Sequence, residues 1–388
     1  MKNRDERVAT MQKVRLLCIG RDLSGGGAPR TEMTLLGHLD RSRFEIKLFY
    51  LCRDQPQIEV PEGLTPEFGA PVHALVNRRM PHIIRRLCAL ARQSDLLFAT
   101  RDGRPIHLAV LAGRIARRPV VGWVHNSLRE FSAYYHPWQL RVARVIYPFV
   151  DRMVAVSRGL MEDTLHFIPR LGERVVTLPN PLDLEAVDCQ ARSALPPWAE
   201  RIFARKTLLA AGWLIHRKGF DILLEAFATV VREGYDVNLL ILGEGPERAT
   251  LEALARNLGL QDRVLMPGYQ ANAYPFFGRA ELFVLSSRYE GLASVILEAL
   301  SLGVPVVAAD CLFGSRELLE DGLYGLLVPP EDPGALAEAI KRLLSSPELC
   351  ARFRKLGPER ARRHDAPIAA RQFEALFFEC LGRRNRNP

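Results

Sequence analysis

The 388-residue sequence contains few cysteines and no long hydrophobic run. Its seven cysteines are scattered and form no Cys-x-x-Cys pair, so we interpret them as small core residues in a reducing compartment rather than as disulfides or metal ligands. No apolar stretch reaches the roughly eighteen residues that a membrane-spanning helix needs. The apolar run after the polar N-terminus is too short for a signal peptide. These absences predict a cytoplasmic protein with no membrane-spanning segment.

Two ligand-binding motifs are also missing. The Gly-rich stretch that contains Gly26 and Gly27 follows an apolar run, and its backbone can approach a ligand closely. It does not have the Gly-x-Gly-x-x-Gly spacing of a dinucleotide site, which counts against a Rossmann dehydrogenase. There is also no Asp-x-Asp pair of the kind that holds Mg²⁺ or Mn²⁺ on a diphosphate. We therefore expect neither a bound cofactor nor a metal requirement.

Positive charge is unevenly distributed along the chain. Residues 1–180 hold 28 Lys and Arg against 17 Asp and Glu, a net charge of +11, whereas the remaining residues carry −2. The segment Arg78–Arg92 has the pattern of a basic amphipathic helix, which would lie against an anionic membrane surface or contact a phosphorylated lipid. Alternatively, it covers a sheet and its arginines are solvated, and both interpretations remain open. Nucleic acid is a poorer explanation, because no aromatic stacking platform accompanies the charge.

The length and the alternation of short apolar runs with amphipathic segments predict an α/β protein of two domains. Each half repeats the βα pattern of a parallel sheet. The expected strands are residues 14–19, 45–50, 96–99, 120–124, 153–156 and 175–178 in the first half, and 208–211, 237–242, 264–266, 282–285, 304–307 and 325–328 in the second. The expected helices include residues 81–93, 105–117, 333–345 and 368–381. We place the domains at 1–182 and 207–365, with a linker at 183–206 and a C-terminal helix in 366–388.

The most informative segment covers residues 286–300. It contains two carboxylates, Glu290 and Glu298, eight residues apart. Glu290 falls in a Gly-containing turn whose free backbone N–H groups favour a phosphate, and Glu298 falls in the apolar helix that follows. A carboxylate among apolar neighbours is rarely buried without a partner. We therefore expect Glu298 to accept hydrogen bonds from a vicinal diol such as a ribose.

Two further candidates stand at the ends of expected strands. Arg217 and Lys218 follow an apolar strand, and Gly219 comes next. A guanidinium binds two phosphate oxygens at once and an ammonium adds a point charge, so this turn suits a diphosphate; the alternative is a solvated charge pair at a helix start. His125 ends another expected strand. Ligands of open α/β sheets bind at the carboxyl ends of strands, although a lone His is more often structural.

Together these motifs resemble the retaining glycosyltransferases of the GT-B fold that form glycosyltransferase family 4, also called glycosyl transferases group 1. The segment from Glu290 to Glu298 is similar to the donor-site signature of that family, and the other motifs occur in family order along nearly the whole chain. The resemblance implies two Rossmann-like domains that face each other across a cleft. The first would bind the acceptor and the second the nucleotide sugar, and the C-terminal helix would pack back on the first. The chain departs from the family at Trp213, where many members have Arg, and Arg217 would supply the missing cation.

The resemblance also implies a role for each candidate residue. Arg217 and Lys218 would neutralise the leaving diphosphate, and Glu290 and His125 would contact the sugar; these four are the expected catalytic residues. Glu298 would hold the ribose. The expected donor-binding residues are Gly26, Gly27, Gly212, Gly243, Gly245, Gly268, Tyr269, Gly291, Leu292, Ala293 and Glu298.

The implied activity is that of a hexosyltransferase-type glycosyltransferase in cell-envelope or polysaccharide synthesis, including lipopolysaccharide. It would move a sugar, with retention, from a nucleotide-diphosphate sugar to a hydroxyl of a glycan or lipid-linked acceptor, and a UDP-sugar is favoured as donor. The enzyme would work in the cytoplasm, as a peripheral protein at the inner face of the membrane if its basic segment binds lipid. The alternatives are a sugar-nucleotide epimerase on the same fold and a non-catalytic nucleotide-sugar-binding protein in which Trp213 marks a decayed site. The sequence specifies neither the sugar nor the acceptor.

Overall fold

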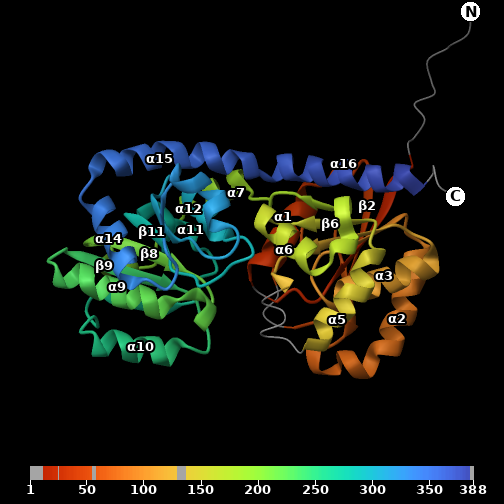
Figure 1. The fold of residues 1–388 in the computed structure, drawn as a ribbon, viewed down its shortest axis with the longest axis horizontal. Coiled ribbons are helices and arrows are strands. Elements are labelled where there is room, and N and C mark those ends of the chain that lie inside the picture. Colours follow the sequence, from red (N-terminus) through yellow and green to blue (C-terminus); the bar gives the residue numbers. More distant parts are fainter. Residues whose placement is uncertain (1–11, 25, 55–57, 129–136, 385–388) are drawn as a thin grey trace, which may run out of the picture.

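The computed structural model describes residues 12–24, 26–54, 58–128 and 137–384. These residues form two α/β domains that lie side by side, with long helices running along one edge of both (Figure 1). Gly25 of the Gly-rich stretch and residues 1–11, which precede the apolar run considered as a signal peptide, lie outside the described residues.

The N-terminal domain contains a seven-stranded parallel sheet with the order β3-β2-β1-β4-β5-β6-β7. Its strands are β1 (Val14–Gly20), β2 (Phe44–Cys52), β3 (Pro66–Ala70), β4 (Leu96–Ala99), β5 (Val120–Val124), β6 (Arg152–Ala155) and β7 (Val175–Thr177). Its helices are α1 (Gly27–His38), α2 (Val76–Arg92), α3 (Arg104–Ala116), α5 (Pro137–Ile146) and α6 (Arg158–Phe167), with 3-10 turns η1 (His73–Leu75), η2 (Tyr147–Phe149) and η3 (Pro169–Arg174). The central strands are buried on both faces, which explains their unbroken apolar sequence.

Two elements of this domain differ from the expectation. Helix α2 begins at Val76 and not at Pro81, which lies inside the helix. A proline removes one backbone hydrogen bond near the helix start, and the buried face of α2, with Val76, Ile83 and Leu87, compensates for it. Strand β3 was not expected. It is a short edge strand that begins at Pro66, and a proline is tolerated at that position of an edge.

The C-terminal domain contains a six-stranded parallel sheet with the order β10-β9-β8-β11-β12-β13. Its strands are β8 (Lys206–Ala211), β9 (Val237–Leu242), β10 (Val264–Gly268), β11 (Leu282–Leu285), β12 (Val306–Ala309) and β13 (Leu326–Val328). Its helices are α9 (Phe220–Arg232), α10 (Arg248–Asn257), α11 (Tyr274–Arg279), α12 (Ser294–Ser301), α13 (Ser315–Leu318), α14 (Pro333–Leu344) and α15 (Pro347–Ala361), with 3-10 turns η4 (His216–Lys218), η5 (Glu320–Gly322) and η6 (Arg362–His364). Helix α15 was not expected, because Gly357 and Pro358 interrupt its helical pattern.

The segment between the two sheets contains α7 (Leu184–Ala191) and α8 (Ala199–Ile202). Val187, Ala199 and Ile202 pack into the core of the C-terminal domain. We expected a linker at residues 183–206.

The chain crosses between the domains twice, and the two crossings lie side by side. The backbone N–H of Leu182 donates to the carbonyl of His364, and that of Ala366 donates to the carbonyl of Leu182, both at 2.9 Å. Helix α16 (Ala366–Arg384) then runs along the N-terminal domain (Figure 1). Its Phe377 packs against Phe98 of β4, with ring centres 5.2 Å apart. The expected α/β architecture, with two Rossmann-like domains and a C-terminal helix that crosses back, is confirmed.

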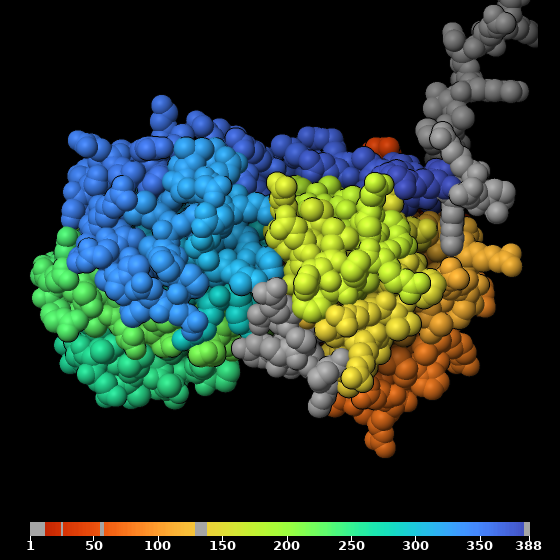
Figure 2. All heavy atoms as spheres, in the orientation of Figure 1, coloured from red at the N-terminus to blue at the C-terminus, as the bar shows by residue number. Residues whose placement is uncertain are grey.

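The carboxyl ends of the two sheets face the boundary between the domains. Gly291, after β11, lies so close to His125, at the end of β5, that a Cβ on Gly291 would stand 1.9 Å from the His125 carbonyl oxygen. The Ser157 hydroxyl donates to the Gly291 carbonyl at 3.1 Å. The space-filling view shows the two domains meeting along this boundary (Figure 2). A cavity of about 370 Å³ on the boundary is lined by α6 and by the loop after β12.

Candidate active site

Lys218 and Glu290 form a buried ion pair at the carboxyl edge of the second sheet. The ammonium of Lys218 donates to Glu290 Oε1 at 2.5 Å, and the Ser287 hydroxyl donates to the same oxygen at 2.7 Å. The two charged side chains are only 14% and 6% exposed. Burial by itself would raise the pKa of Glu290, but Lys218 and Arg217 outweigh it and hold that pKa below its ordinary value. Glu290 is therefore charged at neutral pH, and it fixes the position of the Lys218 ammonium.

Arg217 lies beside this pair, and one of its N–H donors makes no hydrogen bond to the described part of the chain. Its guanidinium carbon is 5.7 Å from the centre of the Tyr289 ring. Its Nε is buried and has no hydrogen-bond partner in the described part of the chain. A buried donor without a partner is costly, and it marks a place where a ligand atom can bind. Trp213, where the resemblance marked a departure from the family pattern, is 61% exposed and contributes no charge.

The expected donor-binding glycines of this domain allow neighbouring strand ends to pack closely. Gly212, Gly243 and Gly268 end or follow β8, β9 and β10. A Cβ on Gly243 would stand 1.9 Å from the carbonyl oxygen of Gly212, so no side chain fits there. Tyr269 follows Gly268 directly, and 56% of its surface is exposed. Gly245 belongs to the same turn and lies against the backbone of Leu214.

The turn formed by Gly291, Leu292 and Ala293 presents free donors at the start of α12. Within the described residues, the backbone N–H groups of these three residues donate to no protein acceptor. Free N–H groups at a helix N-terminus carry partial positive charge and bind anions. The turn is thus suited to hold a negatively charged group next to Lys218.

His125 faces this turn from the N-terminal domain, and it is neutral. Its Nε2 lies 3.1 Å from the carbonyl of Thr100. Since a carbonyl only accepts, the proton is on Nε2 and Nδ1 is left as an acceptor. Burial and the nearby charge of Arg101 lower the pKa of His125 to about 3. Asp102 accepts the backbone N–H of His125 at 3.1 Å, and burial raises the pKa of this carboxyl to about 6.

Glu298 is the carboxylate that the structure leaves most open to a ligand. It lies in α12, partly buried, and makes no hydrogen bond through its side chain among the described residues. Burial raises the pKa of this carboxyl to about 7, and Arg30 of α1 opposes the rise from across the boundary. Arg30 also donates to the Tyr269 hydroxyl at 2.8 Å. These contacts bring the Gly26–Gly27 end of α1 to the same side of the domain boundary as Glu298 and Tyr269.

Sequence reasoning missed a buried charged group behind His125. Arg101 and Glu32 lie there, with Arg101 Nε 3.9 Å from Glu32 Oε2, and the Tyr50 hydroxyl donates to Glu32 Oε1 at 2.6 Å. The signal was present, because Arg101 and Asp102 come after the strand expected at residues 96–99, with only Thr100 between. Polar residues at the carboxyl ends of the strands are candidate ligand contacts on the same grounds as His125.

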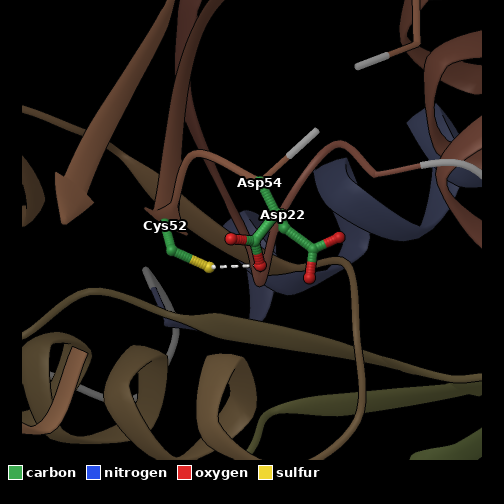
Figure 3. A group of neighbouring side chains, drawn as sticks. All are labelled: Asp22, Cys52 and Asp54. Carbon is green, nitrogen blue, oxygen red and sulfur yellow. Dashed lines mark hydrogen bonds between the residues drawn. The ribbon is translucent and has the colours of Figure 1, made fainter. Parts of the chain in front are cut away.

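One group of side chains has the arrangement of possible metal ligands. Ligand atoms of Asp22, Cys52 and Asp54 lie within 4.8 Å of one another in the N-terminal domain (Figure 3). Burial raises the pKa of the Cys52 thiol to about 12, so it stays protonated, and its sulfur lies 3.5 Å from Asp54 Oδ2. Asp22 already accepts from Ser24 and Arg21. A protonated thiol and an occupied carboxylate make a poor cation site.

Comparison with solved structures defines the class of the fold. The crystal structure of HepE from Anabaena, in complex with UDP and glucose, superposes with a TM-score of 0.79 at 21% identity, and the match covers 94% of this chain and 100% of that one. The two domains therefore have the fold of GT-B glycosyltransferases.

Sequence comparison defines the family. The model of Glycosyltransferase Family 4 matches residues 25–186, and that of Glycosyl transferases group 1 matches residues 200–360. The alpha-D-kanosaminyltransferase of Streptomyces kanamyceticus is 36% identical over 378 residues, 92% of this chain and 97% of that protein. A Campylobacter jejuni relative, N-acetylgalactosamine-N,N'-diacetylbacillosaminyl-diphospho-undecaprenol 4-alpha-N-acetylgalactosaminyltransferase, is 27% identical and covers 90% of this chain and 95% of its own. The chain belongs to glycosyltransferase family 4 and is a hexosyltransferase-type enzyme, as the resemblance predicted.

Proposed function

We propose that this enzyme transfers a hexosyl group, with retention, from a UDP-sugar to a hydroxyl of a lipid-linked or glycan acceptor in cell-envelope or polysaccharide synthesis. The observation that carries the proposal is the buried Lys218–Glu290 pair, next to the unused donor of Arg217 and the free N–H groups at the start of α12. The likeness to a structure that holds UDP and glucose supports the donor class. The Campylobacter relative, whose name contains a diphospho-undecaprenol, supports a lipid-linked acceptor.

The proposed chemistry is mainly electrostatic. The bond between the sugar C1 and the diphosphate oxygen breaks, and the acceptor oxygen bonds to C1 on the same face. The hydroxyl proton passes to the departing diphosphate. Negative charge then grows on the diphosphate, where Lys218, Arg217 and the N–H groups of the turn before α12 would stabilise it. Because Glu290 holds Lys218 in place beforehand, little reorganisation is needed when that charge develops.

The remaining groups would position the donor. Glu298 would accept hydrogen bonds from the two ribose hydroxyls, and binding of those donors would favour its charged form. His125 would accept a hydrogen bond from a sugar hydroxyl through Nδ1. Tyr269, with the turns of Gly243 and Gly268, would line the base pocket. No metal enters this proposal, because the cations that it needs are side chains.

We further infer that the enzyme works at the cytoplasmic face of a membrane through its N-terminal domain. Among the described residues, no helix combines the length and apolarity that a membrane crossing requires. Helix α2 covers the sheet with one face, as one of the two interpretations predicted, and exposes Arg78, Arg79 and Arg85 on the other. Exposed arginines next to the acceptor domain would favour an anionic surface.

The test is a screen of nucleotide sugars for thermal stabilisation, followed by product analysis. A ligand at a hundred times its dissociation constant adds about 2.7 kcal/mol to the free energy of unfolding. The best donor is then incubated with a lipid-linked or glycan acceptor, and the anomeric configuration of the product is read by NMR. Retention supports the proposal and inversion refutes it. Conversion of the donor without an acceptor would indicate the epimerase, and binding without turnover would indicate the non-catalytic alternative with Trp213 in a decayed site.

A further inference from the structure

Helix α5 turns large apolar side chains toward solvent. Trp138 and Val145 are 51% and 65% exposed, and Phe149 in the following turn η2 is 49% exposed. Val145 follows Trp138 by seven residues and Phe149 follows Val145 by four, so the three side chains continue one stripe along the outer side of the helix. Arg141 lies between Trp138 and Val145 in the sequence. A helix that only covers a sheet keeps its apolar stripe inward, so this second, outward stripe needs a separate explanation.

Helix α3 extends the same surface. Its Leu111 and Ile115, one helical turn apart, are 41% and 48% exposed. Arg114 of α3 places its guanidinium carbon 5.1 Å from the centre of the Phe149 ring, which joins the two elements. We call the five side chains Leu111, Ile115, Trp138, Val145 and Phe149 the α3–α5 surface. Five of the twelve large apolar side chains that are exposed in the described chain gather here, and such a gathering marks an interaction site more often than scattered residues do.

The surface is surrounded by positive charge. Helices α2, α3 and α5 lie next to one another on one side of the N-terminal domain, and α5 is the nearest of them to the C-terminal domain (Figure 1). Residues 76–92, 104–118 and 137–149, which include these helices, contain eleven arginines and no Asp or Glu. Of these arginines, only Arg86 forms an ion pair among the described residues, with Glu67 of β3. The positive charge on this side is thus almost uncompensated.

We propose that the α3–α5 surface is the site at which this enzyme docks on an anionic lipid bilayer. Trp settles in the interfacial region of a bilayer because its ring is apolar and its N–H is polar, and Phe belongs to the apolar face of helices that lie in that region. Arginines around them reach the lipid phosphates while their stems lie along apolar surface. The inference deepens the proposed function, because it names the surface that would bring a lipid-linked acceptor to the domain boundary.

The charge of the α3–α5 surface favours a bilayer over a second copy of the chain as its partner. A two-fold dimer would place the same surface of each copy against the other. Arginines would then face arginines, with no carboxylate on these three helices to pair with them. An anionic leaflet supplies the missing negative charge together with an apolar layer.

The experiment is co-sedimentation of the full-length protein with vesicles of phosphatidylcholine, with and without phosphatidylglycerol. The apolar variant carries Trp138→Gln, Val145→Gln and Phe149→Ser. The charge variant carries Arg114→Gln, Arg117→Gln and Arg141→Gln. All of these side chains are exposed, so the fold should persist, which circular dichroism checks. The matched control carries Leu323→Gln and Ile368→Gln, two exposed apolar positions outside the surface.

We expect the wild type and the control to bind vesicles that contain phosphatidylglycerol and to ignore neutral ones. The apolar variant should lose at least about tenfold in partition coefficient at any salt concentration. The charge variant should lose a similar factor at low salt, and raised salt should reproduce that loss in the wild type by screening. Tryptophan emission should shift to the blue on vesicle binding, and Trp138→Phe should remove most of that shift.

Three outcomes would overturn the inference. The apolar variant binds like the wild type, the wild type fails to bind anionic vesicles at low salt, or sedimentation shows a wild-type dimer that the apolar variant abolishes. A parallel titration with UDP, without vesicles, keeps the two proposals separate. If the wild type binds UDP but not anionic vesicles, docking alone is refuted, whereas a wild type that binds vesicles but not UDP refutes the proposed donor.

Discussion

Replacing Glu298 by Gln should make the ligand-free protein more stable relative to wild type as the pH rises through neutrality, and it should weaken the binding of UDP. Burial raises the pKa of the Glu298 carboxyl from 4.5 to about 7, although Arg30 opposes the rise. In the unfolded chain the same carboxyl has its ordinary pKa. Folding therefore makes ionisation of Glu298 unfavourable. The free energy of unfolding falls as the pH rises from the unfolded pKa to the folded one, and the penalty is complete above both values.

The magnitude follows from these two pKa values. A carboxyl pKa that moves from 4.5 to about 7 lowers the free energy of unfolding by about 3 kcal/mol at high pH. Roughly 2.5 kcal/mol of this develops between about pH 5 and about pH 8. Since Gln does not titrate, the stability of Glu298→Gln relative to wild type should rise by up to this amount over the same interval. The cost of burying the amide in Glu298→Gln is equal at about pH 5 and about pH 8, so it cancels when the two stability differences are compared. Solvent reaches part of the Glu298 side chain, so roughly 2.5 kcal/mol is an upper bound.

Urea denaturation of the ligand-free proteins at both pH values measures this difference. Glu225→Gln, at an exposed position on α9, is the matched control for the loss of a carboxylate. Calorimetric titration with UDP tests the ribose contact, whose loss should cost about 1.5 to 3 kcal/mol of binding free energy. UDP should also bind the wild type more weakly as the pH falls below about 7 and the carboxyl is protonated. A stability difference that stays constant with pH would refute the raised pKa, and an unchanged UDP affinity would make the carboxylate structural.

Lys218→Ala should lower turnover at saturating donor by about a hundredfold or more, because the preorganised positive charge that stabilises the leaving diphosphate is lost. An unchanged turnover number in steady-state assays would contradict the assignment. Gly291→Ala should leave both domains folded and still lower turnover, because the new Cβ would stand 1.9 Å from the His125 carbonyl oxygen in the other domain. Small-angle scattering should then show a more open molecule. EDTA should leave the activity unchanged if side chains alone stabilise the diphosphate, and activity that is lost in EDTA and restored by Mn²⁺ would refute that idea.

The C-terminal-domain half of the candidate site could be located in the sequence because its residues are close together along the chain. Arg217 and Lys218 are adjacent, and the turn and helix that carry Glu290 and Glu298 form one continuous segment. The contact between Lys218 and Glu290 was not predicted, although it decides the electrostatics of the site. It joins residues 72 positions apart, and it depends on β8 and β11 being neighbours in the sheet. Strand order of this kind is a tertiary property that the βα alternation does not reveal.

The contacts across the domain boundary were beyond prediction for a different reason. The approach of Gly291 to His125 and the hydrogen bond from Arg30 to Tyr269 require a particular placement of one domain on the other. That placement is set by the paired crossings at Leu182 and by the packing of α16, far from the site in sequence. A sequence motif identifies which strand end carries a residue, but not which residue of the other domain meets it.

The low pKa of His125 limits its part in the proposed reaction. At a pKa of about 3 the imidazole is neutral at neutral pH, with its proton on Nε2 where the Thr100 carbonyl accepts it. So weak a base does not take a proton from a sugar hydroxyl, and the neutral ring is no general acid. Asp102 accepts the backbone N–H of His125 and not its ring, so it does not make the imidazole more basic. Within the proposed reaction, His125 is therefore not the base that takes the acceptor proton, which is consistent with transfer of that proton to the departing diphosphate. Catalysis then depends on how well Lys218 and Arg217 stabilise the charge of the diphosphate rather than on an acid–base pair.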